Sequence, residues 1–128
     1  MSDHQIQVQA LPKPLPEQSD PALGVYSFAY TITITNTGVV PAQLIARHWV
    51  IEDAHGQVQE VKGLGVVGQQ PLLQPGESFE YTSGCQVRTS RAMMHGSYFF
   101  VGVDAHRFEV NIPLFVLDAH PGRSDHLH

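Results

Sequence analysis

The chain is poor in positive charge, with seven lysines and arginines against twelve aspartates and glutamates and a net charge of −5. A nucleic-acid surface needs clustered cations to displace counterions, and an anionic membrane surface attracts the same cations. We therefore expect neither nucleic acid nor membrane as a partner. No apolar run approaches the ~20 residues that cross a bilayer, so a channel or pump is not expected.

Cysteine is nearly absent as well, since Cys85 is the only one and no internal disulfide can form. That usage suits a reducing compartment. The first twenty residues carry polar Asp3, His4, Gln5 and Gln7 where a signal peptide would have an apolar core. The sequence therefore predicts a cytoplasmic location.

Helical periodicity is missing, whereas strand patterns recur along the chain. From Tyr26 to Thr35, aromatic and branched side chains alternate with small polar ones, a period of two that suits a pleated sheet. The segment from Gln43 to Glu52 is apolar on both faces, with Ile45, Trp49 and Ile51 on one of them. Such a strand is covered on both sides, or uses its second face for a partner. We expect Trp49 to be a core residue.

Turn signals separate the strand patterns at short intervals, at 36–38, 53–56, 74–77 and 104–106. This spacing predicts an all-β chain of about seven to nine strands, in a two-sheet β-sandwich of immunoglobulin or fibronectin type III kind. A chain of 128 residues with 42% hydrophobic and 15% charged residues suits one folded domain. We expect that domain to span 1–128, with flexible termini at 1–5 and 119–128.

Two of the expected strands have features of sheet edges. The segment from Gln57 to Lys62 is short and polar, which is typical of an edge. In the last strand, the apolar positions Phe108, Val110, Ile112, Leu114 and Val116 are expected to share one face. Pro113 interrupts that strand and removes a hydrogen-bond donor, which indicates an edge position or a bulge.

The glycines Gly63, Gly65 and Gly68 satisfy G-x-G-x-x-G, a spacing that lets backbone amides approach a pyrophosphate. That mechanism needs a strand before the loop and a helix after it. Pro71 and Pro75 follow closely, so no amphipathic helix is expected to start there. We expect a structural or partner-contacting loop. Binding of a diphosphate-containing metabolite, such as a dinucleoside polyphosphate, is the alternative.

Arg47 alternates onto the predicted face of Trp49, where a charge is costly unless it is paired or lies along the aromatic ring. In the structural interpretation, its guanidinium packs over an aromatic ring at the end of the sheet. In the functional interpretation, it contacts an anion together with the amides of the Gly63–Gly68 loop.

The residues that could carry chemistry form no recognisable catalytic or metal-binding set. The eight histidines lack the spacing of a defined metal site. Ser83 lacks the G-x-S-x-G pattern of a nucleophile elbow, and Cys85 is expected to be a buried, inert thiol. The sequence therefore predicts no catalytic residue, no cofactor and no metal. Weak adventitious metal binding by the tail histidines His120, His126 and His128 is the alternative.

An ordered series of motifs resembles the ApaG family and covers most of the chain from Tyr26 to Leu117. The series comprises Arg47-His48-Trp49, the 53–56 turn, Gly63-Leu64-Gly65-Val66-Val67-Gly68, Pro71, Pro75-Gly76, Tyr81-Thr82-Ser83-Gly84 and Met94-His95-Gly96-Ser97-Tyr98. The resemblance implies a fibronectin type III-like sandwich, in agreement with the strand patterns.

The same resemblance bears on function. Bacterial members are small proteins, often encoded beside a diadenosine tetraphosphate hydrolase, and they are linked to cobalt resistance and magnesium efflux. In eukaryotic F-box and DNA-polymerase-associated proteins the domain is similar to a protein-interaction module. We therefore expect a non-catalytic binding module with an unknown protein partner, a homodimer being a further option. Any role in cobalt or magnesium homeostasis would be that of an accessory factor.

Overall fold

The computed structural model describes residues 3–122; residues 1–2 and 123–128, within the termini expected to be flexible, lie outside the described residues. Two single turns of 3-10 helix are present, η1 (Pro16–Gln18) and η2 (Pro21–Leu23). The eight strands are β1 (Ile6–Pro14), β2 (Tyr26–Asn36), β3 (Ala42–Asp53), β4 (Val58–Leu64), β5 (Leu72–Leu73), β6 (Ser78–Val87), β7 (Arg91–Gly102) and β8 (Arg107–Asp118). The all-β prediction with seven to nine strands is confirmed.

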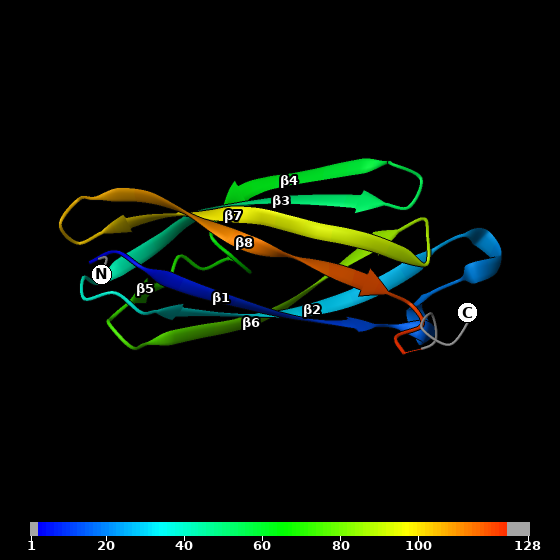
Figure 1. Ribbon diagram of the computed structural model, residues 1–128, viewed down its shortest axis with the longest axis horizontal. Coiled ribbons are helices and arrows are strands. Elements are labelled where there is room, and N and C mark those ends of the chain that lie inside the picture. Colours follow the sequence, from blue (N-terminus) through cyan, green and yellow to red (C-terminus); the bar gives the residue numbers. More distant parts are fainter. Residues whose placement is uncertain (1–2, 123–128) are drawn as a thin grey trace.

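The strands form two antiparallel sheets that pack against each other (Figure 1). The smaller sheet has the order β1-β2-β6. The larger has the order β4-β3-β7-β8, with β5 paired to β3 beside the end of β4. The two-sheet sandwich is confirmed, and β4 lies at a sheet edge as its polar sequence predicts. Its fibronectin type III character stays a prediction.

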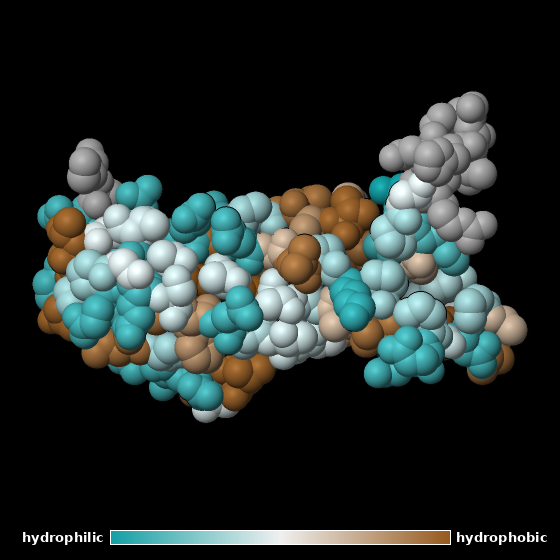
Figure 2. Space-filling view, turned by 90° about the horizontal axis from the view of Figure 1, so that it is seen from below, coloured by the Kyte–Doolittle hydropathy of each residue, from teal (hydrophilic) through white to brown (hydrophobic). Residues whose placement is uncertain are grey.

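The alternation of β2 sorts its side chains between core and solvent. Phe28, Ile32 and Ile34 are buried, whereas the threonines between them face outward. Their hydroxyls bond across to β6: Thr31 lies 2.8 Å from the Thr82 hydroxyl, and Thr35 lies 2.7 Å from that of Ser78. Seen from the side of β1, β2 and β6, the surface is mostly polar, with apolar residues in separate patches (Figure 2).

A β-bulge in β3 overturns one sequence prediction. The register against β7 shifts between Leu44 and Ala46, which leaves Ile45 as the extra residue. The alternation therefore changes phase, since one added residue moves the following side chains to the other face. Leu44 is fully buried, whereas Ile45 is only half-buried. The prediction that Ile45 shares the core face with Trp49 was wrong.

A second bulge corrects the prediction for β8. This strand is an edge strand, as Pro113 indicates, and the register shifts between Met94 and Gly96 of its neighbour β7. Beyond the bulge, Leu117 is buried and Phe115 packs against the core. Leu114 and Val116, predicted to share one face with Ile112, are instead 55% and 38% exposed while Ile112 is buried, because Pro113 and Leu114 together occupy the place of one paired residue.

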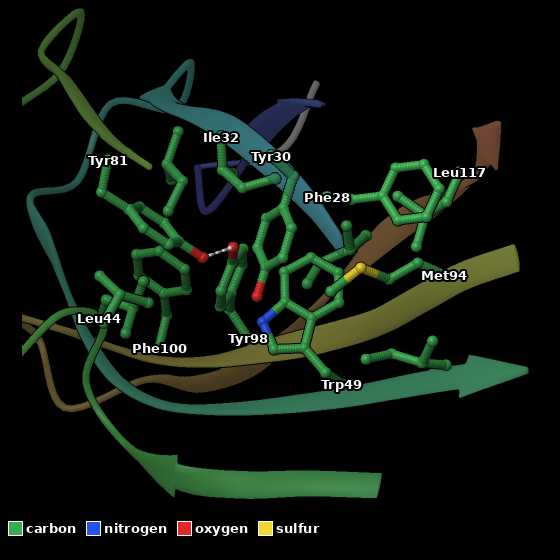
Figure 3. Packing of buried hydrophobic residues seen from close by; sticks show 14 of the residues in the cluster. Phe28, Tyr30, Ile32, Leu44, Trp49, Tyr81, Met94, Tyr98, Phe100 and Leu117 are labelled. Carbon is green, nitrogen blue, oxygen red and sulfur yellow. Dashed lines mark hydrogen bonds between the residues drawn. The ribbon is translucent and has the colours of Figure 1, made fainter. Parts of the chain in front are cut away.

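The core lies between the sheets and is centred on aromatic side chains (Figure 3). Trp49 is 2% exposed, which confirms its predicted burial. Its ring meets those of Tyr30, Tyr98 and Phe115 at 5.4, 6.2 and 6.0 Å between centroids. The hydroxyls of Tyr81 and Tyr98 are hydrogen-bonded at 2.6 Å. Burial raises the pKa of Tyr81 to about 12 and also raises the pKa of Tyr98, so both phenols stay neutral near pH 7.

Candidate functional site

The Gly63–Gly68 loop, here called the glycine loop, begins at the end of β4 and leads toward β5. Both β4 and β5 pair with β3 along the same edge. The backbone of the loop is tied to β3 and to itself. The amide of Gly65 donates to the Ile45 carbonyl at 2.8 Å, and Val66 and Gln69 exchange two backbone hydrogen bonds of 2.8 and 2.9 Å. A short strand, not a helix, follows the loop, so the anion site at a helix N-terminus that the glycine motif requires is missing there.

The structure favours glycine at each of the three positions of the motif, for a different reason at each. Gly65 has a φ of +65°, and a Cβ on it would lie 2.3 Å from the Gln69 carbonyl oxygen. A Cβ on Gly63 would lie 2.8 Å from a guanidinium nitrogen of Arg47. Gly68 has a φ of +78°, and a Cβ on it would meet no atom within 4 Å, so only its backbone conformation favours glycine. The motif therefore has a structural explanation at each position.

The structure brings Arg47 to the glycine loop, where the guanidinium faces carbonyl oxygens. Its Nη1 donates to the carbonyls of Leu64 and Gly65 at 3.0 and 2.9 Å. These bonds fasten the start of the loop to β3, and they engage Nη1 of the guanidinium that the functional interpretation assigned to an anion. The geometry thus gives Arg47 a structural contact with the loop.

The two valines at the loop tip point to opposite environments. Val66 is fully buried in the core, whereas Val67 is 52% exposed. Val67 also has a positive φ of 43°. A buried anchor next to an exposed side chain, on a hydrogen-bonded loop, holds Val67 in one position at the surface.

A hollow lies beside the loop on the outer face of the larger sheet. Its cavity volume is about 430 Å³, and it is lined by residues of four strands, including Ala46, His48, Lys62, Ser97, Phe99 and Glu109. Leu64 also lines it and is 73% exposed. The hollow therefore combines apolar side chains with charges of both signs.

A hydroxyl, an imidazole and a carboxylate gather near this hollow, and the sequence interpretation did not identify them. His48 is paired with Ser97 across β3 and β7, and its Nε2 lies 2.7 Å from Oε1 of Glu60. Bonding to His48 lowers the pKa of the Glu60 carboxyl. Because Nε2 is bound to Glu60, this nitrogen is not free to act as a base toward Ser97. The arrangement is a hydrogen-bonded pair of His48 and Glu60 on the exposed face of the sheet.

The histidines are the side chains of this chain best suited to bind a transition metal. His4 lies 2.8 Å from the Asp104 carboxylate, and its ring stacks on that of His106 at 4.0 Å. Between residues 3 and 122, no group of three or more histidine, cysteine, aspartate or glutamate residues is arranged to hold a metal ion. His126 and His128 of the tail lie outside the described residues.

Cys85 is a free, half-buried thiol, and burial raises its pKa to about 11. The thiolate is the form that reacts with iodoacetamide. Near pH 8, we therefore expect native Cys85 to be alkylated about a hundredfold more slowly than a small thiol. The rate should rise as the pH approaches 11. Mass spectrometry of labelled protein measures it, with urea-unfolded protein as the control. Equal rates in the native and unfolded states would contradict the assignment of an inert thiol.

Three comparisons place the chain among known proteins. Residues 16–102 match the family model of the ApaG domain. A protein named ApaG from an Acidovorax species is 66% identical over 115 residues, which cover 90% of this chain and 84% of the relative. Another from Ralstonia nicotianae is 60% identical over 117 residues, 91% of this chain and 94% of the relative.

A solved structure agrees with the sequence comparisons. The crystal structure of a protein from Bordetella pertussis superimposes with a TM-score of 0.90 at 54% identity, over 92% of this chain and 96% of that one.

No helix described between residues 3 and 122 is long and apolar enough to cross a membrane.

Proposed function

Because the chain belongs to the ApaG domain family, we propose that it is a non-catalytic binding module whose partner is another protein. The partner contacts the outer face of the larger sheet, at the hollow beside the glycine loop. The observation that carries this proposal is the hollow itself, where Phe99 and Leu64 offer apolar surface next to Lys62 and Glu109. Interfaces combine apolar contact and polar groups in this way.

The state of one candidate nucleophile supports a binding role. Cys85 is held neutral by burial. Gly65 bonds to Ile45 and Arg47 of β3, which makes the loop a fixed border of the hollow. A preformed border lowers the ordering cost of binding.

The family resemblance implies a link to cobalt and magnesium homeostasis, and we propose that this link operates through the binding role. A binding module affects cation transport through the protein that it contacts, as an accessory factor in the cytoplasm. No step of the proposal requires the chain itself to bind the cation.

Filling the hollow is expected to abolish partner binding. Ser97 lies on β7 inside the hollow, so Ser97→Arg places a long charged side chain there. Thr82→Arg puts the same side chain on the exposed outer face of the smaller sheet and serves as the matched control. Captured proteins are quantified by mass spectrometry after affinity purification from a native lysate.

We expect a partner that is captured by the unchanged protein and by Thr82→Arg, and that is reduced at least about tenfold with Ser97→Arg. Thermal melting establishes that both variants are folded. Capture that is equal for the two variants would place the binding surface elsewhere, and the absence of any specific partner would contradict the interaction role.

A further inference from the structure

The outer edge of β4 lies at the margin of the larger sheet. β4 pairs with β3 along one side, and no strand described between residues 3 and 122 pairs with its other side (Figure 1). The side chain of Gln59 donates to the Gln86 carbonyl of β6 at 3.1 Å and holds this edge against the smaller sheet. β4 thus presents an ordered strand that lacks a neighbour.

Two hydrogen bonds fix which backbone groups point away from β3. Gly65 donates to Ile45, and Asp53 donates to Gln57, one at each end of the β3–β4 ladder. In an antiparallel ladder, residues that bond the neighbour alternate with residues that point away from it. The N–H and C=O groups of Val58, Glu60, Lys62 and Leu64 therefore point to the open side, where the Leu64 carbonyl also accepts from Arg47.

The side chains of the same four residues lie on the outer face of β4 in the order apolar, negative, positive, apolar. Val58 and Leu64 are 56% and 73% exposed, and the Glu60 side chain is 56% exposed. An antiparallel copy centred on Val61 aligns Val58 with the partner's Leu64, and Glu60 with the partner's Lys62. The strand is complementary to itself in both charge and hydrophobicity.

We propose that the chain forms a symmetric dimer in which β4 pairs antiparallel with β4 of a second copy. Each Glu60 then exchanges backbone hydrogen bonds with the partner's Lys62, and their opposite charges face each other across the strands. Parallel in-register pairing would instead place like charges opposite one another, so the charge order selects the antiparallel dimer. The two larger sheets join into one continuous sheet.

β4 is better suited to this pairing than the edge of the smaller sheet. β6 carries a single charged side chain, Glu80, so pairing with itself forms no attractive charge pair. The other two edge strands, β1 and β8, contact each other within the chain. The dimer does not rest on the proposed protein partner, since it is argued from the strand edge. Lys62 and Leu64 also line the hollow, so the two surfaces share these side chains.

Charge reversal tests the pairing directly. E60K places two positive side chains opposite each other at two symmetric positions, and K62E does the same with negative ones. Each single variant is expected to raise the dimer Kd by at least about tenfold, and the double variant E60K/K62E to restore it to within about threefold. Sedimentation equilibrium measures Kd, and Glu80→Lys is the control that leaves it unchanged.

Mixing the two single variants provides an independent readout. E60K and K62E together align opposite charges in both pairs, so native mass spectrometry should show the mixed dimer in excess over either homodimer. Circular dichroism establishes that each variant is folded. A wild-type chain that is monomeric up to its solubility limit would overturn the proposal. So would a dimer whose Kd is the same in all variants, or a mixture without preference for the mixed dimer.

Discussion

Replacement of Trp49 by alanine is expected to lower the free energy of unfolding by about 3–5 kcal/mol, the range for deletion of a large buried side chain. Trp49 is 2% exposed and lies between the sheets, against Tyr30 of β2, Tyr98 of β7 and Phe115 of β8. Its removal therefore leaves a cavity bounded by both layers, which neither sheet can fill alone.

Denaturant unfolding followed by circular dichroism measures this loss. Trp49→Phe is the matched control, since it keeps an aromatic ring in the same place and should cost less than the alanine variant. Trp49 is the only tryptophan, so the native emission maximum reports its environment directly. A loss below about 1 kcal/mol for the alanine variant, or an emission maximum typical of exposed indole, would contradict the proposed core.

Gly65→Ala is expected to lower the free energy of unfolding by about 2–5 kcal/mol. Its φ of +65° costs an L-residue about 1–2 kcal/mol. The new Cβ would also lie 2.3 Å from the Gln69 carbonyl oxygen, so the loop has to shift. Such overpacking costs a further 1–3 kcal/mol, roughly. The same shift would disturb Val66, which is fully buried directly beside it.

Gly68 provides the matched control for this substitution. Its φ of +78° is equally unfavourable for alanine, but nothing lies within 4 Å of the new Cβ. Gly68→Ala should therefore show only the cost of the backbone conformation, and the difference between the two variants isolates the contact with Gln69. Equal losses in denaturant unfolding would refute the steric explanation.

The same pair of variants separates the structural interpretation of the loop from metabolite binding. We expect titration calorimetry with ATP or diadenosine tetraphosphate to show no tight binding to the unchanged protein. Sub-micromolar binding that is lost in folded Gly65→Ala would favour the diphosphate alternative, in which backbone amides of the loop hold the ligand.

The alternating pattern of β2 was sufficient to predict its buried and exposed faces, because side-chain direction in a regular strand follows from position alone. The same rule failed in β3 and β8, where bulges at Ile45 and Pro113 add a residue. Pro113 signalled its irregularity in the sequence, whereas Ile45 is a good strand former and gave no such signal.

The strand pattern of the sequence predicts β7 only around Ser97 to Val103, although the strand begins at Arg91. Gly96 interrupts the pattern there, and its lack of a side chain is required because a Cβ would lie 2.0 Å from the His48 carbonyl oxygen. A glycine in a strand indicates close backbone approach as well as a break, and the pattern alone does not distinguish them.

At the candidate site, the sequence pattern identified the glycine loop and Arg47 but did not predict the hollow beside them. Its residues come from four strands, and Ser97 and His48 meet only through the register of β3 and β7. The outward apolar face predicted for 43–52 was the available signal, since a second apolar face points to a covering partner. The pairing partners of that face required the structure.

The contact between β1 and β8 has a consequence for the synthesis of the protein. These are the first and last of the strands described between residues 3 and 122, and their contact closes one side of the sandwich. A nascent chain therefore cannot complete its fold until β8 has left the ribosome, and until then the β7 edge lacks its neighbour. Such late, non-local closure makes folding slow and leaves an open sheet edge in the unfinished chain, so truncation within β8 would be expected to cause aggregation.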